Sequence, residues 1–235
     1  MKVVLYKKPK NVRIIEGFPG FGLIGTIATE YLMEHLETEK IGVIETPEAA
    51  PMIAIHQNKV IEPISLHYNK KHNLVFVHAI NIGKELAWLV AEAVLDVAKQ
   101  LSAKEIISLE GVGSPSNEDE RVFYFAGNGV AIPQSLANAA SPLMEGIIIG
   151  VTGALLAKDH EIPHVALFAE AKSGIPDSKA AAHILGALGA YANLKIDPNP
   201  LLKQAQLFEK KLKTIMQQGA EAEKTQEEKQ LSYVG

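Results

Sequence analysis

Cysteine is absent from this chain of 235 residues, and its absence excludes several classes of protein at once. Disulfide-stabilised scaffolds, thiolate-bound zinc ribbons and enzymes with a thiol nucleophile all depend on cysteine. A reducing compartment is compatible with such a composition, and we expect a cytoplasmic location.

An excess of positive charge is also absent. The chain carries 23 lysines and arginines against 27 aspartates and glutamates, for a formal net charge of −4. This balance provides no basic field that would attract nucleic acid. No apolar run approaches the roughly 18 residues that a membrane helix needs, and residues 1–6 lack the apolar core of a signal peptide. We therefore expect a soluble protein that binds neither nucleic acid nor a membrane.

Sequence motifs of common catalytic sites are scarce. The chain contains no G-x-S-x-G nucleophile elbow and no G-x-x-x-x-G-K-[ST] phosphate loop. Ser114, Ser116, His183 and Asp177 permit Ser-His-Asp chemistry in principle, but their spacing gives it no specific support. The eight histidines are interpreted as structural or surface residues, so we predict no metal site, no cofactor and no enzymatic activity.

What the sequence does contain is a glycine-rich turn between a predicted strand and a predicted helix. Residues 12–16 are rich in β-branched side chains, as in a strand, and residues 23–36 repeat apolar side chains at helical spacing. The turn includes the pattern G-x-G-x-x-G, which in this context is typical of a phosphate-binding loop at a helix N-terminus. Glu45, at the end of the next predicted strand, stands where a ribose ligand is expected. One hypothesis is therefore a nucleotide- or nucleoside-binding enzyme that uses the loop 17–25 and Glu45.

The composition of this turn favours a different interpretation. Pro19 offers no backbone N–H to a phosphate, and Phe18 and Phe21 make the turn bulky and apolar. Glycine also serves turns that need a positive φ angle or a close backbone approach. We therefore predict a tight corner whose aromatic side chains pack into the core or against another subunit. The structural positions of this corner are Gly17, Pro19, Gly20, Gly22 and Gly25.

The rest of the chain alternates predicted strands and helices, which indicates a single α/β domain. Strands are expected at 3–6, 41–45, 64–68, 74–79, 105–110 and 163–169, and helices at 84–101, 150–160, 177–191 and 201–217. Hairpins are expected at 52–62 and at 121–132, the second around an Asn-Gly turn. This order predicts a three-layer α/β/α sandwich with a mixed, mostly parallel central sheet and β-hairpin insertions. Asp177 is expected to cap a helix, and Trp88 to pack in the ordinary way.

Four glutamates stand at the ends of predicted strands: Glu16, Glu45, Glu110 and Glu170. The carboxyl ends of parallel strands meet at one edge of a sheet, so we expect these side chains to converge there. They would then either perform acid–base chemistry or hold the loops in place through backbone N–H groups. We favour the second role, because the sequence pairs no clear lysine or arginine with them.

The last residues differ in character from the domain of residues 1–217. Residues 218–230 are polar and almost free of apolar side chains, as in a solvated helix or a disordered tether. The chain then ends in an apolar, aromatic tip that folding alone explains poorly. We interpret 218–235 as a tail whose tip binds a partner through Leu231, Tyr233 and Val234.

The stretch from Glu16 to Gly25 resembles the opening motif of the proteasome assembly chaperone family, in its archaeal branch. Further matching pieces follow in the expected order: Glu110 to Gly113, Gly146 to Leu156, and Ile175 to Asp177 leading into Ala180 to Ala182. Together they span about residues 10 to 217. The resemblance implies a fold similar to that of nucleoside phosphorylases without their catalytic residues. It also implies a non-enzymatic role in assembling the proteasome core, with binding to α-subunits and self-association into a homo-oligomer.

Some members of this family carry a C-terminal signal that inserts between α-subunits. It consists of a hydrophobic residue, a tyrosine and any final residue. This chain departs from the signal, because Tyr233 is third from the end and Ser232 precedes it. This departure does not support insertion into those pockets. The apolar tip on a polar tether favours a docking tail on physical grounds alone, and the alternative is a frayed end without a role.

Overall fold

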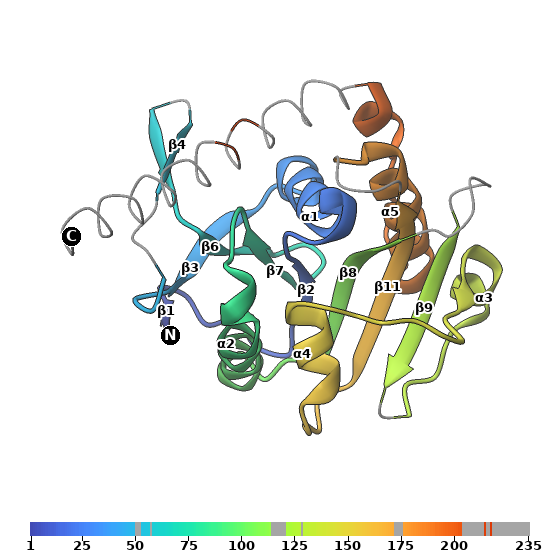
Figure 1. The fold of residues 1–235 in the computed structure, drawn as a ribbon, viewed down its shortest axis with the longest axis horizontal. Coiled ribbons are helices and arrows are strands. Elements are labelled where there is room, and N and C mark those ends of the chain that lie inside the picture. The colour runs from blue at the N-terminus through green and yellow to red at the C-terminus, as the bar shows by residue number, and fades with distance from the viewer. Residues whose placement is uncertain are drawn as a thin grey trace, which may run out of the picture.

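A computed structural model describes residues 1–49, 53–56, 58–113, 121–127, 129–171, 176–203, 214 and 217. Nine strands form one sheet in the order β1-β3-β6-β7-β2-β8-β11-β9-β10, with helices on both faces (Figure 1). The strands are β1 (Lys2–Leu5), β2 (Arg13–Gly17), β3 (Glu39–Glu45), β6 (Ile64–Asn69), β7 (Leu74–Ala79), β8 (Glu105–Gly113), β9 (Val122–Gly127), β10 (Ser141–Pro142) and β11 (His164–Ala171).

The centre of the sheet is parallel and its flanks are largely antiparallel. β7, β2, β8 and β11 run in the same direction, and β10 pairs with β9 in parallel. The four other pairings, β1–β3, β3–β6, β6–β7 and β11–β9, are antiparallel. The predicted α/β class and mixed sheet are thus confirmed. The expectation of a mostly parallel sheet was wrong, because parallel pairings equal antiparallel ones among the described strands.

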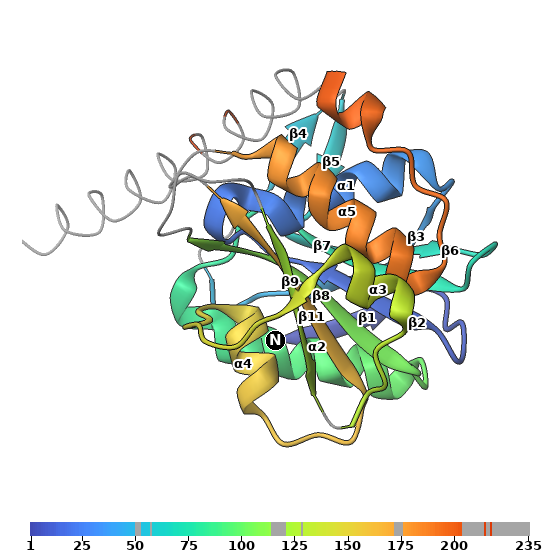
Figure 2. The same cartoon turned by 90° about the vertical axis from the view of Figure 1, so that its right-hand side faces the viewer.

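Helices cover the two faces in separate groups. α1 (Ile24–His35), α3 (Gln134–Ala139) and α5 (Ser178–Ala192) pack on one face, and α2 (Ala87–Gln100) and α4 (Val151–Ala157) pack on the other (Figure 2). A 3-10 turn precedes α1 at Phe21–Leu23 and another precedes α2 at Lys84–Leu86. The layers are therefore helix, sheet and helix, as predicted.

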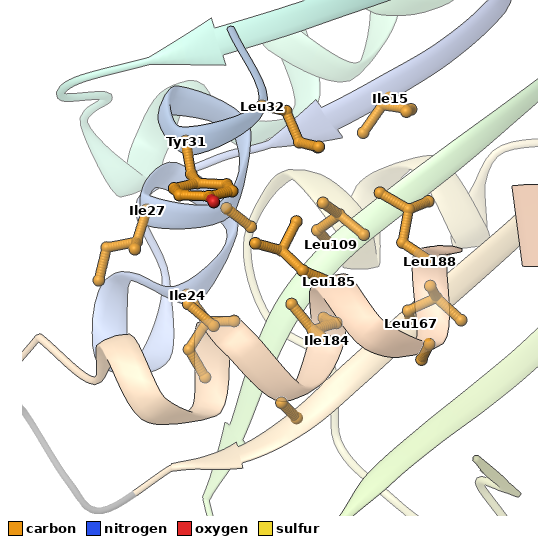
Figure 3. Close-up of a cluster of buried hydrophobic side chains, with 14 of the residues drawn as sticks. Ile15, Ile24, Ile27, Tyr31, Leu32, Leu109, Leu167, Ile184, Leu185 and Leu188 are labelled. Atoms are coloured by element: carbon orange, nitrogen blue, oxygen red, sulfur yellow. The ribbon is translucent and has the colours of Figure 1, made fainter. Parts of the chain in front are cut away.

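Two hydrophobic cores follow from the pleat of the central strands, because successive side chains on a strand point to opposite faces. Ile14 belongs to the core under α2 and α4, and its neighbour Ile15 to the core under α1 and α5. All six residues of β7 are buried, as expected for a strand covered on both faces. Figure 3 shows the core under α1 and α5, in which Ile24 and Tyr31 of α1 lie near Ile184 and Leu185 of α5.

Local predictions had mixed outcomes. The first hairpin is confirmed as β4 (Ala54–His56) and β5 (Lys59–Ile61), a separate two-stranded ribbon with Asn58 at φ 59°. Asp177 caps α5, as predicted, because its side chain accepts a hydrogen bond from the Ala180 N–H at 3.0 Å. The second hairpin was wrong. β9 pairs with β11 and β10, and residues 130–133 form no strand.

Trp88 also differs from its prediction. Its side chain is 55% exposed at the start of α2, and the Lys158 ammonium lies 5.6 Å from the centre of its ring. A separate helical stretch is present at residues 199–203, after α5 has ended at Ala192. Most of the predicted helix to 217 and the whole tail 218–235 lie outside the described residues, so the division of the chain at 217 stays a prediction. No helix in the described ranges is long and apolar enough to span a membrane.

Candidate functional site

The glycine-rich turn links β2 to α1 at the carboxyl edge of the sheet. Its backbone adopts the left-handed region twice in succession, at Gly22 (φ 64°) and Leu23 (φ 53°). Glycine takes this conformation without cost, whereas leucine does so only where surrounding structure holds it. Gly22 also accepts a hydrogen bond through its carbonyl from the Asp177 N–H at 2.9 Å, which joins the turn to the start of α5.

The other glycines of the turn permit close contact between backbones. A Cβ on Gly25 would lie 2.2 Å from the Leu109 carbonyl oxygen, and one on Gly17 would lie 2.1 Å from the Gly25 oxygen. α1 therefore rests directly on β2 and β8. At Gly20, the position of a Cβ is already taken by the Glu110 carboxylate, whose Oε1 would be 1.9 Å away. Protein atoms thus already occupy the space that a side chain would need at each of these three glycines.

The aromatic residues of the turn point in different directions. Phe18 is buried in the core under α2 and α4, while Phe21 is 41% exposed. The expectation that such side chains enter the core is therefore confirmed for Phe18. Phe21 presents an apolar ring to solvent at the edge of the sheet.

Two of the four predicted glutamates meet beneath this turn. Glu16 at the end of β2 and Glu110 in β8 are both buried, and the Thr152 hydroxyl of α4 lies 3.2 Å from an oxygen of each. A hydroxyl has one hydrogen to donate. Thr152 can therefore donate to only one carboxylate, and a hydrogen bond to the second requires that carboxyl to be protonated. The geometry points to at least one shared proton in this cluster.

The pKa values of both glutamates are consistent with a proton held in this cluster. Burial raises the pKa of Glu16 to about 8, although the hydroxyls of Ser108 and Thr152 partly oppose the shift. Burial likewise raises the pKa of Glu110 to about 7, opposed by the backbone N–H groups of Gly111 and Phe21 and by Thr152. The Gly111 N–H donates to Glu110 at 3.1 Å. Glu110 thus accepts backbone hydrogen bonds from its own strand, through Gly111, and from the glycine turn, through Phe21. The bond to Phe21 agrees with the loop-holding role that we favoured for these acids.

Glu170 performs a similar task at a separate place. It is buried in β11 and accepts two side-chain hydrogen bonds from Arg121, at 2.8 and 3.0 Å, and one from the Arg121 backbone N–H at 3.3 Å. This arginine partner was not predicted, so the expectation that no lysine or arginine pairs with these acids was wrong for Glu170. Bidentate pairing of this kind fixes geometry as well as charge.

Glu45 does not join the cluster. It ends β3, which lies three places from β2 in the sheet because β6 and β7 stand between them. Its side chain is half exposed and pairs with Lys2 at 3.5 Å. The predicted convergence of all four glutamates was therefore wrong for Glu45. The nucleotide hypothesis required Glu45 beside the glycine turn, and the sheet order does not bring them together.

Our interpretation of the histidines overlooked one spacing. Residues 160–164 read His-Glu-Ile-Pro-His, the H-E-x-x-H spacing that binds zinc when it lies on a helix. Here the first residues of this run are not helical and His164 begins β11. The His164 Nε2 is bonded to the Ser108 hydroxyl at 2.7 Å, and burial lowers its pKa to about 4. The described part of the chain contains no group of three side chains able to hold a metal ion.

The predicted partner-binding residues Leu231, Tyr233 and Val234 lie outside the described residues. Thr152 was not singled out from the sequence at all. Its only signal was a position in the first turn of a predicted helix, which gives no hint that it faces two carboxyls.

Comparison with known proteins gives a consistent set of relatives. The model of the PAC2 family matches residues 14–216. The uncharacterized protein MJ0106 of Methanocaldococcus jannaschii is 28% identical over 211 residues, which cover 89% of this chain and 87% of the relative.

Two solved structures extend this result. Pyrococcus furiosus PbaA, described as an archaeal homolog of proteasome-assembly chaperone, is 27% identical, with a TM-score of 0.78 over 94% of this chain and 99% of its own. Pyrococcus furiosus PbaB, described as an archaeal proteasome activator, shares the fold at 23% identity, with a TM-score of 0.70 over 92% of this chain and 98% of its own.

Proposed function

Because the chain belongs to the PAC2 family, we propose that it is a non-enzymatic, homo-oligomeric proteasome assembly chaperone that binds proteasome α-subunits. The likeness to PbaA over 94% of the chain is the observation that carries this proposal. A cytoplasmic location follows from such a partner.

We further infer that the glycine turn is a packing device and not a ligand site. Its glycine positions are filled by the Glu110 carboxylate and by backbone atoms of β8 and α1. The Glu110 carboxyl occupies the space beside Gly20, and Pro19 offers no backbone N–H to a phosphate. Other surfaces, including the tail, would then bind the α-subunits.

Size-exclusion chromatography with light scattering tests the main proposal directly. The chain, recombinant proteasome α-subunits and a mixture of the two are run at equal concentration. We expect the mixture to give a species heavier than either component. Unchanged elution of both components would refute binding to α-subunits.

Deletion of residues 231–235 should weaken binding to α-subunits by about tenfold or more. The reason is that several tails on one oligomer bind together, so the deletion removes all of these weak contacts at once and with them the gain in affinity from multivalent binding. Surface plasmon resonance on immobilised α-subunits measures the change. Deletion of the polar residues 226–230 with the tip retained is the matched control, and an equal affinity of the two deletions would contradict a role for the tip.

Nucleotides should leave the melting temperature unchanged. A ligand that binds only the native state raises it by mass action, so a thermal-shift series with ATP, NAD and nucleosides at millimolar concentration is informative. A rise that depends on ligand concentration and disappears in Gly22→Ala would restore the nucleotide hypothesis.

A further inference from the structure

α4 meets the sheet through a single polar contact, which lies in its first turn. The buried Thr152 hydroxyl is 3.2 Å from Glu16 Oε1 and 3.2 Å from Glu110 Oε2. Within the described residues, no other hydrogen bond joins residues 144–157 to a strand of the sheet. The other buried side chains of α4 are apolar. The position of its first turn therefore depends on apolar packing and on this one hydroxyl.

The two carboxyls differ in the hydrogen-bond donors around them. Glu110 also accepts hydrogen bonds from the Gly111 N–H at 3.1 Å and from the Phe21 N–H. Glu16 Oε2 is buried and has no hydrogen-bond partner in the described part of the chain. Because a buried carboxylate needs donors in place of water, the negative charge belongs on Glu110 and the proton on Glu16. The Glu16 carboxyl then donates to the Thr152 hydroxyl, which donates to Glu110.

No cation is placed to compensate a second negative charge in this cluster. Among the described residues neither carboxyl has an ion-pair partner, and the charge that acts on Glu16 is that of Glu110, which has the same sign. The other titratable or charged groups on the surrounding elements have partners of their own: His164 of β11 with the Ser108 hydroxyl, Glu170 of β11 with Arg121, and Lys158 after α4 with Glu92 of α2.

Loss of the Glu16 proton therefore breaks the chain of hydrogen bonds. The Thr152 hydroxyl then has one hydrogen for two carboxylates, and Glu16 carries a buried charge that has no other donor. Water can relieve this charge only if a neighbouring element moves aside. Glu16 and Glu110 are fixed in the central strands β2 and β8. The first turn of α4 is thus the part that can move.

The residues just before α4 lie against this first turn. A Cβ on Gly153 would be 2.5 Å from the Ile148 carbonyl oxygen, so the two backbones are in direct contact. Residues 143–150 form neither helix nor strand, and Met144 and Ile147 in this segment are more than four-fifths exposed. Burial of these side chains does not hold the segment in place, so it should follow a movement of the turn.

We propose that Glu16, Thr152 and Glu110 form a pH-sensitive switch, in which the proton on Glu16 holds the first turn of α4 on the sheet and its loss releases this turn together with residues 143–150. Burial raises the pKa of Glu16 to about 8, so release occurs as pH rises above neutrality. The switch is a property of the folded chain and does not depend on the proposed role in proteasome assembly.

Amide hydrogen exchange of the full chain at pH 6, 7.5 and 9 tests this switch. Protection factors, which compare each rate with that of an unstructured chain at the same pH, remove the intrinsic effect of pH. We expect protection of the Ala154 and Leu155 amides in α4 to fall about tenfold or more between pH 6 and 9, since each pKa unit restored on opening is a factor of about ten. The Val90 and Val94 amides in α2 should change less.

Three variants assign the effect to the cluster. Glu16→Gln is neutral at every pH, so its α4 protection should stay constant between pH 6 and 9. Thr152→Val removes the hydroxyl and should have the low α4 protection already at pH 6, whereas Thr152→Ser keeps a hydroxyl and should behave like the native chain. Glu45→Gln is the control, because Glu45 is half exposed and outside the cluster. Far-UV circular dichroism at pH 6 checks that each variant is folded.

Four results would overturn the proposal. The first is α4 protection in the native chain that does not change between pH 6 and 9. The second is an equal fall in α4 and α2, which would show a loss of global stability without local release. The third is an unchanged pH dependence in Glu16→Gln, which would assign the titration to another group. The fourth is native α4 protection in Thr152→Val at pH 6, which would show that the hydroxyl does not hold the turn.

Discussion

Gly25→Ala should lower the free energy of unfolding by about 3 kcal/mol or more, at the upper end of the cost of overpacking a core. The added Cβ would lie 2.2 Å from the Leu109 carbonyl oxygen and 2.9 Å from the Gly17 Cα. Both are backbone atoms of strands in the centre of the sheet, so neither can rotate away as a side chain would. α1 must then lift from β2 and β8, and the core between them loses contact.

Gly186→Ala is the matched control for this experiment. Gly186 also lies in a helix, α5, but a Cβ there would meet nothing within 4 Å. Alanine has the higher helix propensity, so this change should stabilise the protein by up to about 1 kcal/mol. Urea denaturation of both variants measures the difference. A Gly25→Ala variant as stable as Gly186→Ala would show that α1 does not rest on the sheet in the way described.

Glu16→Gln should stabilise the protein at alkaline pH by about 2 to 4 kcal/mol and have little effect near pH 5. The folded-state pKa of Glu16 is raised by burial to about 8, so the native state keeps a proton that the unfolded state has already released. The native state therefore loses stability as pH rises from about 4.5 to about 8. Glutamine has the shape of the neutral carboxyl and carries no charge to bury, which removes this loss.

Denaturation curves at pH 5.5, 7 and 8.5 measure that effect. The control is Glu45→Gln, since Glu45 ends β3 at the same edge of the sheet but is exposed. We expect its curves to parallel those of the native protein at every pH. Native and Glu16→Gln curves that remain parallel between pH 5.5 and 8.5 would contradict a neutral Glu16 in the folded state.

Two histidines limit stability on the acid side. The pKa values of His67 and His164 are each lowered to about 4, chiefly by burial. The unfolded state binds these protons first, so stability is lost as pH falls from about 6.5 to about 4. Glu16 and Glu110 lower the stability as pH rises, and the two histidines lower it as pH falls. We therefore expect the maximum of stability near pH 5.5, where the two effects are about equal.

The sequence predicted those parts of the fold that depend on local periodicity. β2, α1, β7, α2 and α5 each combine a strong apolar repeat with clear flanking residues, and they were found within a few residues of their expected ends. Asp177 was recognisable because a cap acts on its own helix. Pattern and propensity decide such elements before any long-range contact forms.

Long-range pairing accounts for the errors. The Asn-Gly pair after residue 127 indicated a hairpin, but β9 instead pairs with β11, some 40 residues later in the chain, along six register positions. That ladder outweighs the local turn preference. The position of Glu45 was misjudged for a similar reason, because the sequence does not reveal that β6 and β7 lie between β3 and β2.

The cluster of Glu16, Glu110 and Thr152 was predictable from the sequence only for its two glutamates. That Glu16 and Glu110 lie toward the carboxyl ends of parallel strands can be read from the sequence, although β8 continues to Gly113, three residues beyond its expected end. Thr152 could not be found in this way, since its contact depends on where α4 crosses the sheet. The contribution of Arg121 to Glu170 also depends on the pairing of β9 with β11, which the sequence did not show.

The proton held among Glu16, Glu110 and Thr152 alters the charge that the folded molecule presents. The formal value of −4 treats every carboxyl as ionised, so one retained proton makes the native chain less acidic than its composition states. Its isoelectric point should accordingly exceed the 6.1 obtained from the sequence. Unfolding at neutral pH then releases that proton to the buffer, and the calorimetric enthalpy of the transition will include the buffer's own heat of ionisation.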